Sequence, residues 1–176
     1  TACRTEFEAV FQLPFLYYQI WIHPKFGTLP GGMDFVMDDE IATKLYNEVY
    51  HLAVHLLKVY NGSGKTFLLG HWEGDWVLLE GYDSTKNASE RNIQGMIRQY
   101  EIRQRAVEAA RNEISHENVW IGHYAEVNRP LDAKDHGKTR LINAVLPHVK
   151  VDLVSYSAYD ALWPDRLTEA LSYIEA

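Results

Sequence analysis

Four short apolar segments alternate with longer segments of helical periodicity along the whole chain. The apolar segments are rich in aromatic and β-branched residues and are typical of strands: 17–22, 67–69, 119–122 and 151–154. Apolar residues that recur every three or four positions predict helices over 41–59, 93–114, 141–146 and 167–174, with the end of an earlier helix at 7–11. This alternation implies parallel strands joined by right-handed crossovers, so we expect an α/β protein.

Capping residues mark the ends of the two longest predicted helices. Asp38 and Asp39 stand where an N-cap and first-turn anions favour initiation, and Asn61-Gly62 supplies a stop. Asn87, followed three residues later by Glu90, is typical of a capping pair. The second long helix is therefore expected to begin near position 88.

Two architectures fit this order of elements, an open doubly wound sheet and part of a (β/α)8 barrel. We favour the barrel, because polar and aromatic residues follow each strand after the first, and a barrel gathers such residues at one rim. An open sheet would concentrate them at one switch point. A whole barrel needs ~250 residues, whereas this chain has 176. We predict one domain over 1–176, a partial TIM barrel of about four βα units with two unpaired strand edges.

Charge and composition restrict the partners. The net charge is −7 and the basic residues are scattered, whereas nucleic acid and anionic membrane surfaces require clustered cations. No apolar run has the length needed to cross a bilayer. Cys3 is the only cysteine, so neither an internal disulfide nor a cysteine zinc site is expected. We expect no nucleic acid, no membrane and no cofactor as partners.

One segment imitates a nucleotide-binding motif. Gly62-Ser63-Gly64-Lys65-Thr66 matches the end of a phosphate-binding loop, but Val59 stands where that motif requires its first glycine. The segment also precedes a strand, whereas a phosphate-binding loop follows one and opens a helix. We interpret the segment as a turn.

The densest group of polar and aromatic residues follows the second strand, within FLLGHWEGDW at 67–76. Unpaired carboxyls are expensive to bury, so this group suits a pocket mouth: His71, Trp72, Glu73, Asp75 and Trp76. Glu73 is the best candidate for chemistry, because apolar rings beside a carboxyl raise its pKa and keep a general acid protonated. The structural alternative is an ion pair between Glu73 and an arginine such as Arg129.

Further candidates follow the third and fourth strands: His123, Tyr124, Glu126, Tyr156, Tyr159 and Asp160. Glu126 could supply a second carboxylate, but we favour a hydrogen-bonding role, since glutamates at loop starts are usually solvated. His71, Glu73 and Asp75 would share one face of a continuing strand and could bind a metal together with His123. We nevertheless expect no metal. Flat rings beside carboxyls match a sugar, which offers C–H faces and hydroxyl groups.

Three consecutive units, strand-FLLGHWEGDW, strand-VWIGHYAEVN and strand-VDLVSYSAYDA, resemble those of (β/α)8 glycoside hydrolases. In the retaining clan of that fold, the acid/base Glu follows strand 4 and the nucleophilic Glu follows strand 7. The resemblance implies a central fragment, strands 3 to 6, that hydrolyses an O-glycosidic bond of a carbohydrate outside the cell. It makes Glu73 the acid/base. The implied sugar-binding residues are His71, Trp72, Asp75, Trp76, His123, Tyr124, Glu126, Tyr156 and Tyr159.

The chain departs from that family at two points. Trp72 stands where the clan has Asn, and no strand 7 supplies the nucleophile. Retaining hydrolysis needs two carboxyls ~5–5.5 Å apart, one donating a proton and one attacking the anomeric carbon. Two alternatives remain open. One is a non-catalytic protein that binds sugar or assembles with identical chains at its sheet edges, and the other is a metal-dependent barrel hydrolase.

Overall fold

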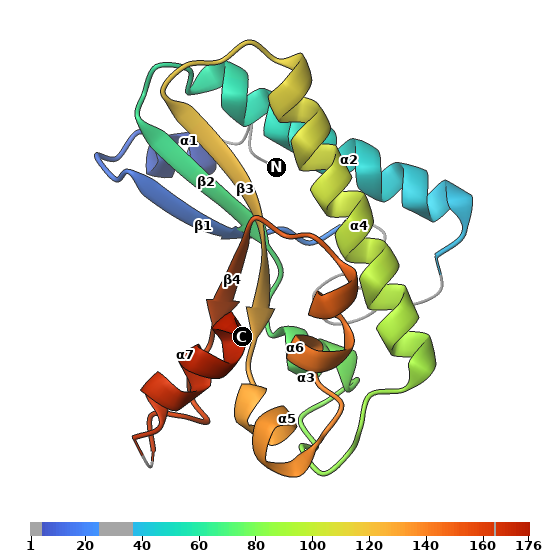
Figure 1. Ribbon diagram of the computed structural model, residues 1–176. Coiled ribbons are helices and arrows are strands. Elements are labelled where there is room, and N and C mark those ends of the chain that lie inside the picture. Colours follow the sequence, from blue (N-terminus) through green and yellow to red (C-terminus); the bar gives the residue numbers. More distant parts are fainter. Residues whose placement is uncertain (1–4, 25–36, 164) are drawn as a thin grey trace.

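The computed structural model describes residues 5–24, 37–163 and 165–176, so Cys3 lies outside the described residues (Figure 1). The elements, in chain order, are α1 (Thr5–Phe11), β1 (Tyr17–Trp21), α2 (Asp39–Val59), β2 (Lys65–Gly70), α3 (Gly74–Leu78), α4 (Glu90–Glu113), β3 (Val119–Val127), α5 (Pro130–His136), α6 (Leu141–Ala144), the 3-10 helix η2 (Leu146–His148), β4 (Leu153–Tyr156) and α7 (Leu167–Glu175).

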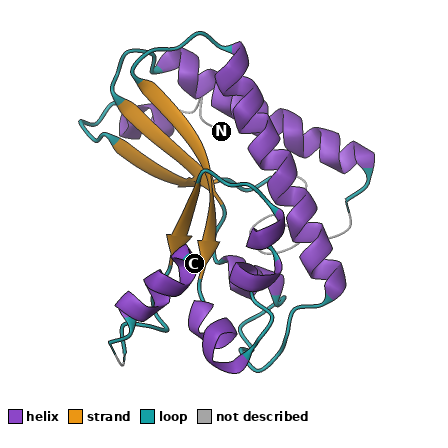
Figure 2. Ribbon diagram, viewed as in Figure 1, coloured by secondary structure: helices purple, strands orange, loops and turns teal. Residues whose placement is uncertain are grey.

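The four strands form one parallel sheet in which each strand pairs with the next strand of the chain, in the order β1-β2-β3-β4. Helices α2 and α4 lie side by side along the sheet (Figure 2). The predicted α/β class with a parallel sheet is confirmed. Within the described ranges, no helix has the length and hydropathy of a membrane-spanning segment.

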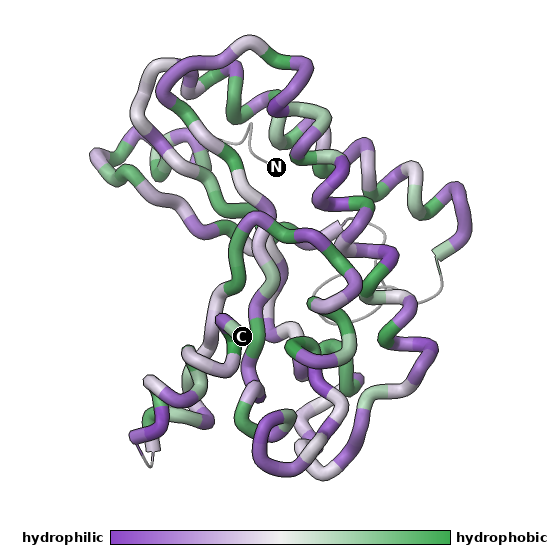
Figure 3. Tube along the Cα trace, viewed as in Figure 1, coloured by the Kyte–Doolittle hydropathy of each residue, from purple (hydrophilic) through white to green (hydrophobic). Residues whose placement is uncertain are grey.

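Side chains on the two faces of the sheet are buried to different extents. Partner residues of neighbouring strands lie on the same face, so Phe67 and Ile121 share one face, which α2 and α4 bury completely. Tyr17 and Trp120 belong to the opposite face and are 73% and 37% exposed. Along α2 and α4, apolar residues alternate with polar ones (Figure 3), as expected for helices with one buried side.

An aromatic cluster lies near the amino ends of β1 and β2 and consists of Phe11, Tyr18, Tyr60 and Phe67. The Tyr18 and Phe67 rings are stacked with centroids 5.3 Å apart, and the Phe11 ring meets both edge-on at 5.2 and 5.3 Å. Such pairs contribute about 0.5–1.5 kcal/mol each beyond the area they bury. The cluster joins α1 and the end of α2 to the sheet.

The capping prediction is confirmed for one helix and wrong for the other. Asp38 is the N-cap of α2, and its Oδ1 accepts the Ile41 backbone N–H at 2.8 Å. The N-cap of α4 is Ser89, not Asn87. Asn87 instead accepts the backbone N–H of Thr139 at 3.0 Å and so joins two loops that are distant in the sequence.

Three further boundaries differ from the sequence prediction. β3 continues to Val127, so the residues at 123–126 lie in the strand and not in a loop. β4 begins at Leu153 rather than at position 151. The sequence did not predict the short helices α3 and α5, because helices of five and seven residues are too short to show an apolar period. Residues 62–64 form a turn, as predicted, with Gly62 and Gly64 at positive φ, whereas Lys65 and Thr66 already belong to β2.

Candidate functional site

The candidate site lies at the carboxyl ends of β2 and β3, where the chain leaves β2 and turns into α3. Gly70 is the last residue of β2, and a Cβ at this position would lie 2.3 Å from the Tyr124 ring. Only glycine therefore allows Tyr124 to cross from β3 and pack on the β2 backbone. Tyr124 is fully buried by this packing, and burial raises the pKa of its hydroxyl to about 12.

Glu73 has a strained backbone. Its φ of 55° and ψ of 59° lie in the left-handed region, which costs a non-glycine residue roughly 1–2 kcal/mol. The next residue fixes this geometry, because a Cβ at Gly74 would lie 2.2 Å from the Glu126 carbonyl oxygen. Such strain persists only where the surroundings enforce it, and it is concentrated at functional sites.

Glu126 brings a second carboxylate to Glu73. Its Oε1 accepts the Glu73 backbone N–H at 2.9 Å, and its side chain is 5% exposed. Glu73 is half-buried, and within the described part of the chain its carboxylate forms no ion pair. Burial and the charge of Glu126 raise the pKa of Glu73. The alternative ion pair with Arg129 is not observed, because Arg129 binds Asp132 at 2.7 and 3.0 Å.

Asp75 is fully buried and fixes the segment that carries Glu73. Its Oδ2 accepts the backbone N–H groups of Asn128 and Arg129 at 2.7 and 2.9 Å, and its Oδ1 accepts that of Leu141 at 2.7 Å. Its own N–H donates to Asn128 Oδ1 at 3.0 Å. Burial raises the pKa of Asp75, and these backbone donors oppose the rise. Asp75 was predicted to bind sugar, and in the structure both of its carboxylate oxygens accept hydrogen bonds from backbone N–H groups.

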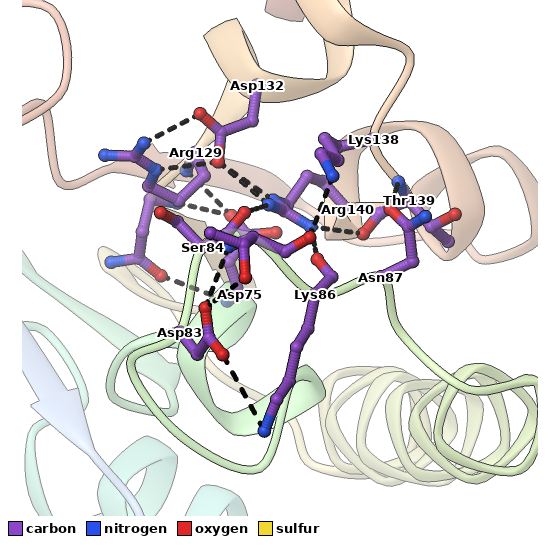
Figure 4. A network of polar contacts seen from close by, with 12 residues as sticks. Asp75, Asp83, Ser84, Lys86, Asn87, Arg129, Asp132, Lys138, Thr139 and Arg140 are labelled. Atoms are coloured by element: carbon purple, nitrogen blue, oxygen red, sulfur yellow. Dashed lines mark hydrogen bonds and ion pairs between the residues drawn. The ribbon is translucent and has the colours of Figure 1, made fainter.

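A second buried charge extends this arrangement (Figure 4). Arg140 is fully buried, and its Nε and Nη2 donate to Asp132 Oδ2 at 3.2 and 2.9 Å. It also donates to the carbonyl oxygens of Ser84 and Lys86. These bonds offset the cost of burying the ion pair. We refer to Asp75, Asn128, Arg129, Asp132 and Arg140 as the Asp75 network. Only Asp75 among them was a predicted site residue.

His71 and His123 point to the helices and not to the rim. Both are fully buried, and the His71 ring stacks on Tyr100 with centroids 5.1 Å apart and bonds to its hydroxyl. Burial, then the charge of Arg103, lowers the pKa of His71 to about 3 and that of His123 well below its usual value. Both residues are therefore neutral. Both residues were predicted to bind sugar, and in the structure both rings face α4, where His71 contacts Tyr100 and His123 lies beside Gln104.

The proposed metal ligands do not come together. The strand alternation that would have aligned His71, Glu73 and Asp75 ends at Gly70, and the chain then coils into α3. Asp75 binds backbone N–H groups, and His123 Nδ1 lies 3.2 Å from Gln104 Oε1. Among the residues that the structure describes, no three His, Cys, Asp or Glu side chains are grouped to hold a metal.

Two indoles flank the strained segment. The Trp72 ring lies 6.3 Å from that of Trp21, which the sequence did not single out although it ends β1. Trp76 packs against Tyr82 at 5.6 Å and lies under the Arg129 guanidinium at 5.6 Å. Trp72, which precedes Glu73 in the sequence, thus forms an aromatic pair with Trp21.

The aromatic residues after β3 are separated from Glu73. Tyr156 is the last residue of β4 and pairs with Val127 of β3. Its ring packs on the helix side of the sheet, and its hydroxyl donates a hydrogen bond to Asp160. Burial and Asp160 raise its pKa well above the usual value. Tyr159 is 83% exposed. The structure gives neither residue a place beside Glu73.

The site therefore consists of Glu73, Glu126, Trp72 and Trp21 on a backbone held by the Asp75 network. A scan against protein-family models found no match for this chain, and searches among curated proteins and solved structures found none either.

Proposed function

We propose that the protein hydrolyses an O-glycosidic bond of a carbohydrate, with Glu73 as general acid and then general base. One observation carries this proposal: a half-buried carboxyl with a raised pKa, held in a strained backbone beside a second carboxylate. A general acid must remain protonated near neutral pH, and burial beside a like charge favours the protonated form.

In the proposed reaction, Glu73 donates its proton to the oxygen of the departing sugar. The resulting carboxylate then removes a proton from the attacking water. Trp72 and Trp21 offer flat faces on which the sugar rings can stack. Glu126 acts on Glu73 by holding its backbone and raising its pKa. The nucleophile of a retaining reaction is not assigned to Glu126, because its Oε1 is already bound to the Glu73 N–H.

We also propose that the four βα units are the central strands of a (β/α)8 barrel. The sequential strand order and the packing of α2 and α4 side by side support this proposal. A doubly wound sheet reverses its strand order at a switch point and carries helices on both faces. In a barrel, the carboxyl ends of the strands form the catalytic face, which is where Glu73 and Glu126 lie.

The test compares Glu73→Gln with wild type on two classes of glycoside. Substrates with poor leaving groups need the proton and should lose activity by roughly 10²–10⁴-fold, whereas activated aryl glycosides should lose far less. Glu80→Gln is the control, since Glu80 has the same left-handed backbone at the other end of α3 but is exposed. Equal losses on both substrate classes would contradict the acid role.

The pH profile tests the role of Glu126. Because Glu126 raises the pKa of Glu73, Glu126→Gln should lower that pKa, and the basic limb of the kcat/KM profile should move to lower pH. A basic limb that stays in place would remove Glu126 from the proposal.

One observation favours a non-catalytic alternative, in which the protein binds sugar or assembles through its sheet. Tyr17 and Trp21 are 73% and 53% exposed on the open face of the sheet, although both belong to a strand. Sugar binding without turnover, or a mass in solution of several chains with no activity, would favour this alternative over hydrolysis.

A further inference from the structure

A fully buried arginine on the helix side of the sheet has no hydrogen-bond partner among the described residues. Arg103 lies on α4, and none of its three guanidinium nitrogens has a hydrogen-bond partner within the described part of the chain. It takes part in none of the ion pairs formed by those residues. Burying an unpaired charge is strongly unfavourable, and breaking a buried pair typically leaves a protein destabilised. Among the described residues, no side chain compensates this cost.

The groups around Arg103 do not neutralise it. His71 and His123 are neutral, and the charge of Arg103 is one cause of their lowered pKa values. Tyr100 and Tyr124 are the other polar neighbours, and burial raises the pKa of both hydroxyls. Burial lowers the pKa of Arg103 itself to about 10, so it carries its charge at neutral pH. Among these five described side chains, Arg103 alone is therefore charged.

Arg103 lines a cavity of about 580 Å³ between α1, the end of β1 and α2. This volume lies in the usual range for small-molecule sites. The walls are mainly apolar: Phe7, Phe11, Ile20, Ile22, Val49 and Leu52. Among the polar lining residues, His23 and His51 are exposed and Glu48 is half-buried, whereas Arg103 is fully buried.

We propose that this cavity binds a small monocarboxylate with an apolar body, whose carboxylate pairs with the Arg103 guanidinium. A guanidinium presents parallel N–H donors that match the two oxygens of a carboxylate, and the pair gains strength where water is excluded. The apolar walls would bury the rest of the ligand. A single negative charge balances the single buried cation. A phosphate dianion would require a second cation, and Arg103 is the only arginine or lysine among the described residues that line the cavity.

The proposal is independent of glycoside hydrolysis. Glu73 and Glu126 are not among the residues that line this cavity, and Arg103 is not part of the candidate site, although Trp21 belongs to both. Variants at Glu73 and Arg103 therefore test the two proposals separately.

Calorimetric titration and thermal unfolding of the full chain with decanoate, below its micelle concentration, test the proposal. Decanoate should bind and raise the melting temperature. Decanol has the same alkyl chain without the charge, and acetate has the charge without the alkyl chain. Both should bind at least about tenfold more weakly than decanoate, a factor worth 1.4 kcal/mol. Arg103→Met should weaken decanoate binding at least about tenfold and leave decanol unchanged. Arg105→Met, an exposed arginine on the same helix, is the matched control.

A second variant separates loss of the site from loss of the fold. Leu52→Trp keeps Arg103 but fills the apolar part of the cavity, so it should lose decanoate binding while the protein stays folded. Without ligand, Arg103→Met should melt at the wild-type temperature or higher, because it removes an unpaired buried charge. The proposal is overturned if decanoate does not bind wild type, if decanol binds equally well, or if Arg103→Met or Leu52→Trp binds decanoate as wild type does.

Discussion

The two ends of the sheet are stabilised by different forces. Near the amino ends of β1 and β2, the aromatic cluster around Phe67 consists of apolar rings in contact. Beyond the carboxyl ends of β2 and β3, the Asp75 network consists of directed hydrogen bonds between buried charges and backbone groups. Packing tolerates small shifts of the rings, whereas hydrogen bonds fix distances and angles. The carboxyl end therefore has the rigid geometry that a strained Glu73 requires.

The largest effect is expected from Phe67→Ala in the aromatic cluster. Phe67 is fully buried and contacts three other rings, so its removal should leave a cavity and lower the free energy of unfolding by about 3–5 kcal/mol. Tyr17→Ala removes an exposed ring of the neighbouring strand and should cost about 0.5 kcal/mol or less. Urea unfolding measures both, and equal losses would show that the cluster does not dominate this end.

Asp75→Ala should have the next largest effect and a different signature. It leaves three backbone N–H groups without an acceptor, and each costs about 1–3 kcal/mol unless water replaces the carboxylate. We therefore expect the free energy of unfolding to fall by about 2–4 kcal/mol. In Asp75→Ala, hydrogen exchange should accelerate mainly at the backbone amides of Asn128, Arg129 and Leu141. In Phe67→Ala, these three amides should stay better protected than the other amides of the chain. Asp75→Asn retains one acceptor and should lose less. Uniform acceleration along the chain would contradict a local role.

The sequence predicted the scaffold because its signals are local. The strand segments and the apolar periods of α2, α4 and α7 are readable within short windows, and the Asp38 cap lies beside the helix that it starts. The Asp75 network has no such signal. Its bonds join Asp75 to Asn128 and Leu141, which lie 53 and 66 residues away, so a single sequence gives no indication that these groups meet.

Glu73 was predicted from sequence, but the environment of its predicted neighbours was not. The sequence predicts that β3 ends at position 122, which places His123, Tyr124 and Glu126 after the strand and not in it. In the strand, alternate residues face opposite sides, so His123 turns to α4 while Glu126 turns to Glu73. A boundary error of a few residues thus decided which side chains were assigned to the site.

The strain at Glu73 predicts a smaller, third effect. Glycine adopts a left-handed backbone without penalty and alanine does not, so Glu73→Gly should be more stable than Glu73→Ala by about 1 kcal/mol. The same pair of substitutions at Glu80, whose φ is 54°, gives the reference for strain in an exposed turn. Urea unfolding measures the differences. Equal stability of the two Glu73 variants would mean that the segment relaxes when the side chain is removed, and that the Asp75 network does not enforce the strain.

The smallest effect is expected from polar contacts at the surface, which tests whether burial or polarity gives the Asp75 network its strength. Arg166 binds Asp135 and Glu169, and these contacts lower the pKa of each carboxyl to about 2. A depressed carboxyl pKa stabilises the fold above the ordinary value near 4, and this contribution disappears as the pH falls towards 2.

Arg166→Gln should therefore be less stable than wild type at neutral pH, by less than Asp75→Asn, because solvent screens its contacts. The difference should shrink in high salt and vanish near pH 2. Urea unfolding over a pH series at two salt concentrations measures it. A difference in the free energy of unfolding that is independent of salt and persists in acid would show that Arg166 stabilises α7 by packing its side chain on α5. These surface contacts would then stabilise the protein by packing, as the aromatic cluster does, and not by directed polar bonds, as the Asp75 network does.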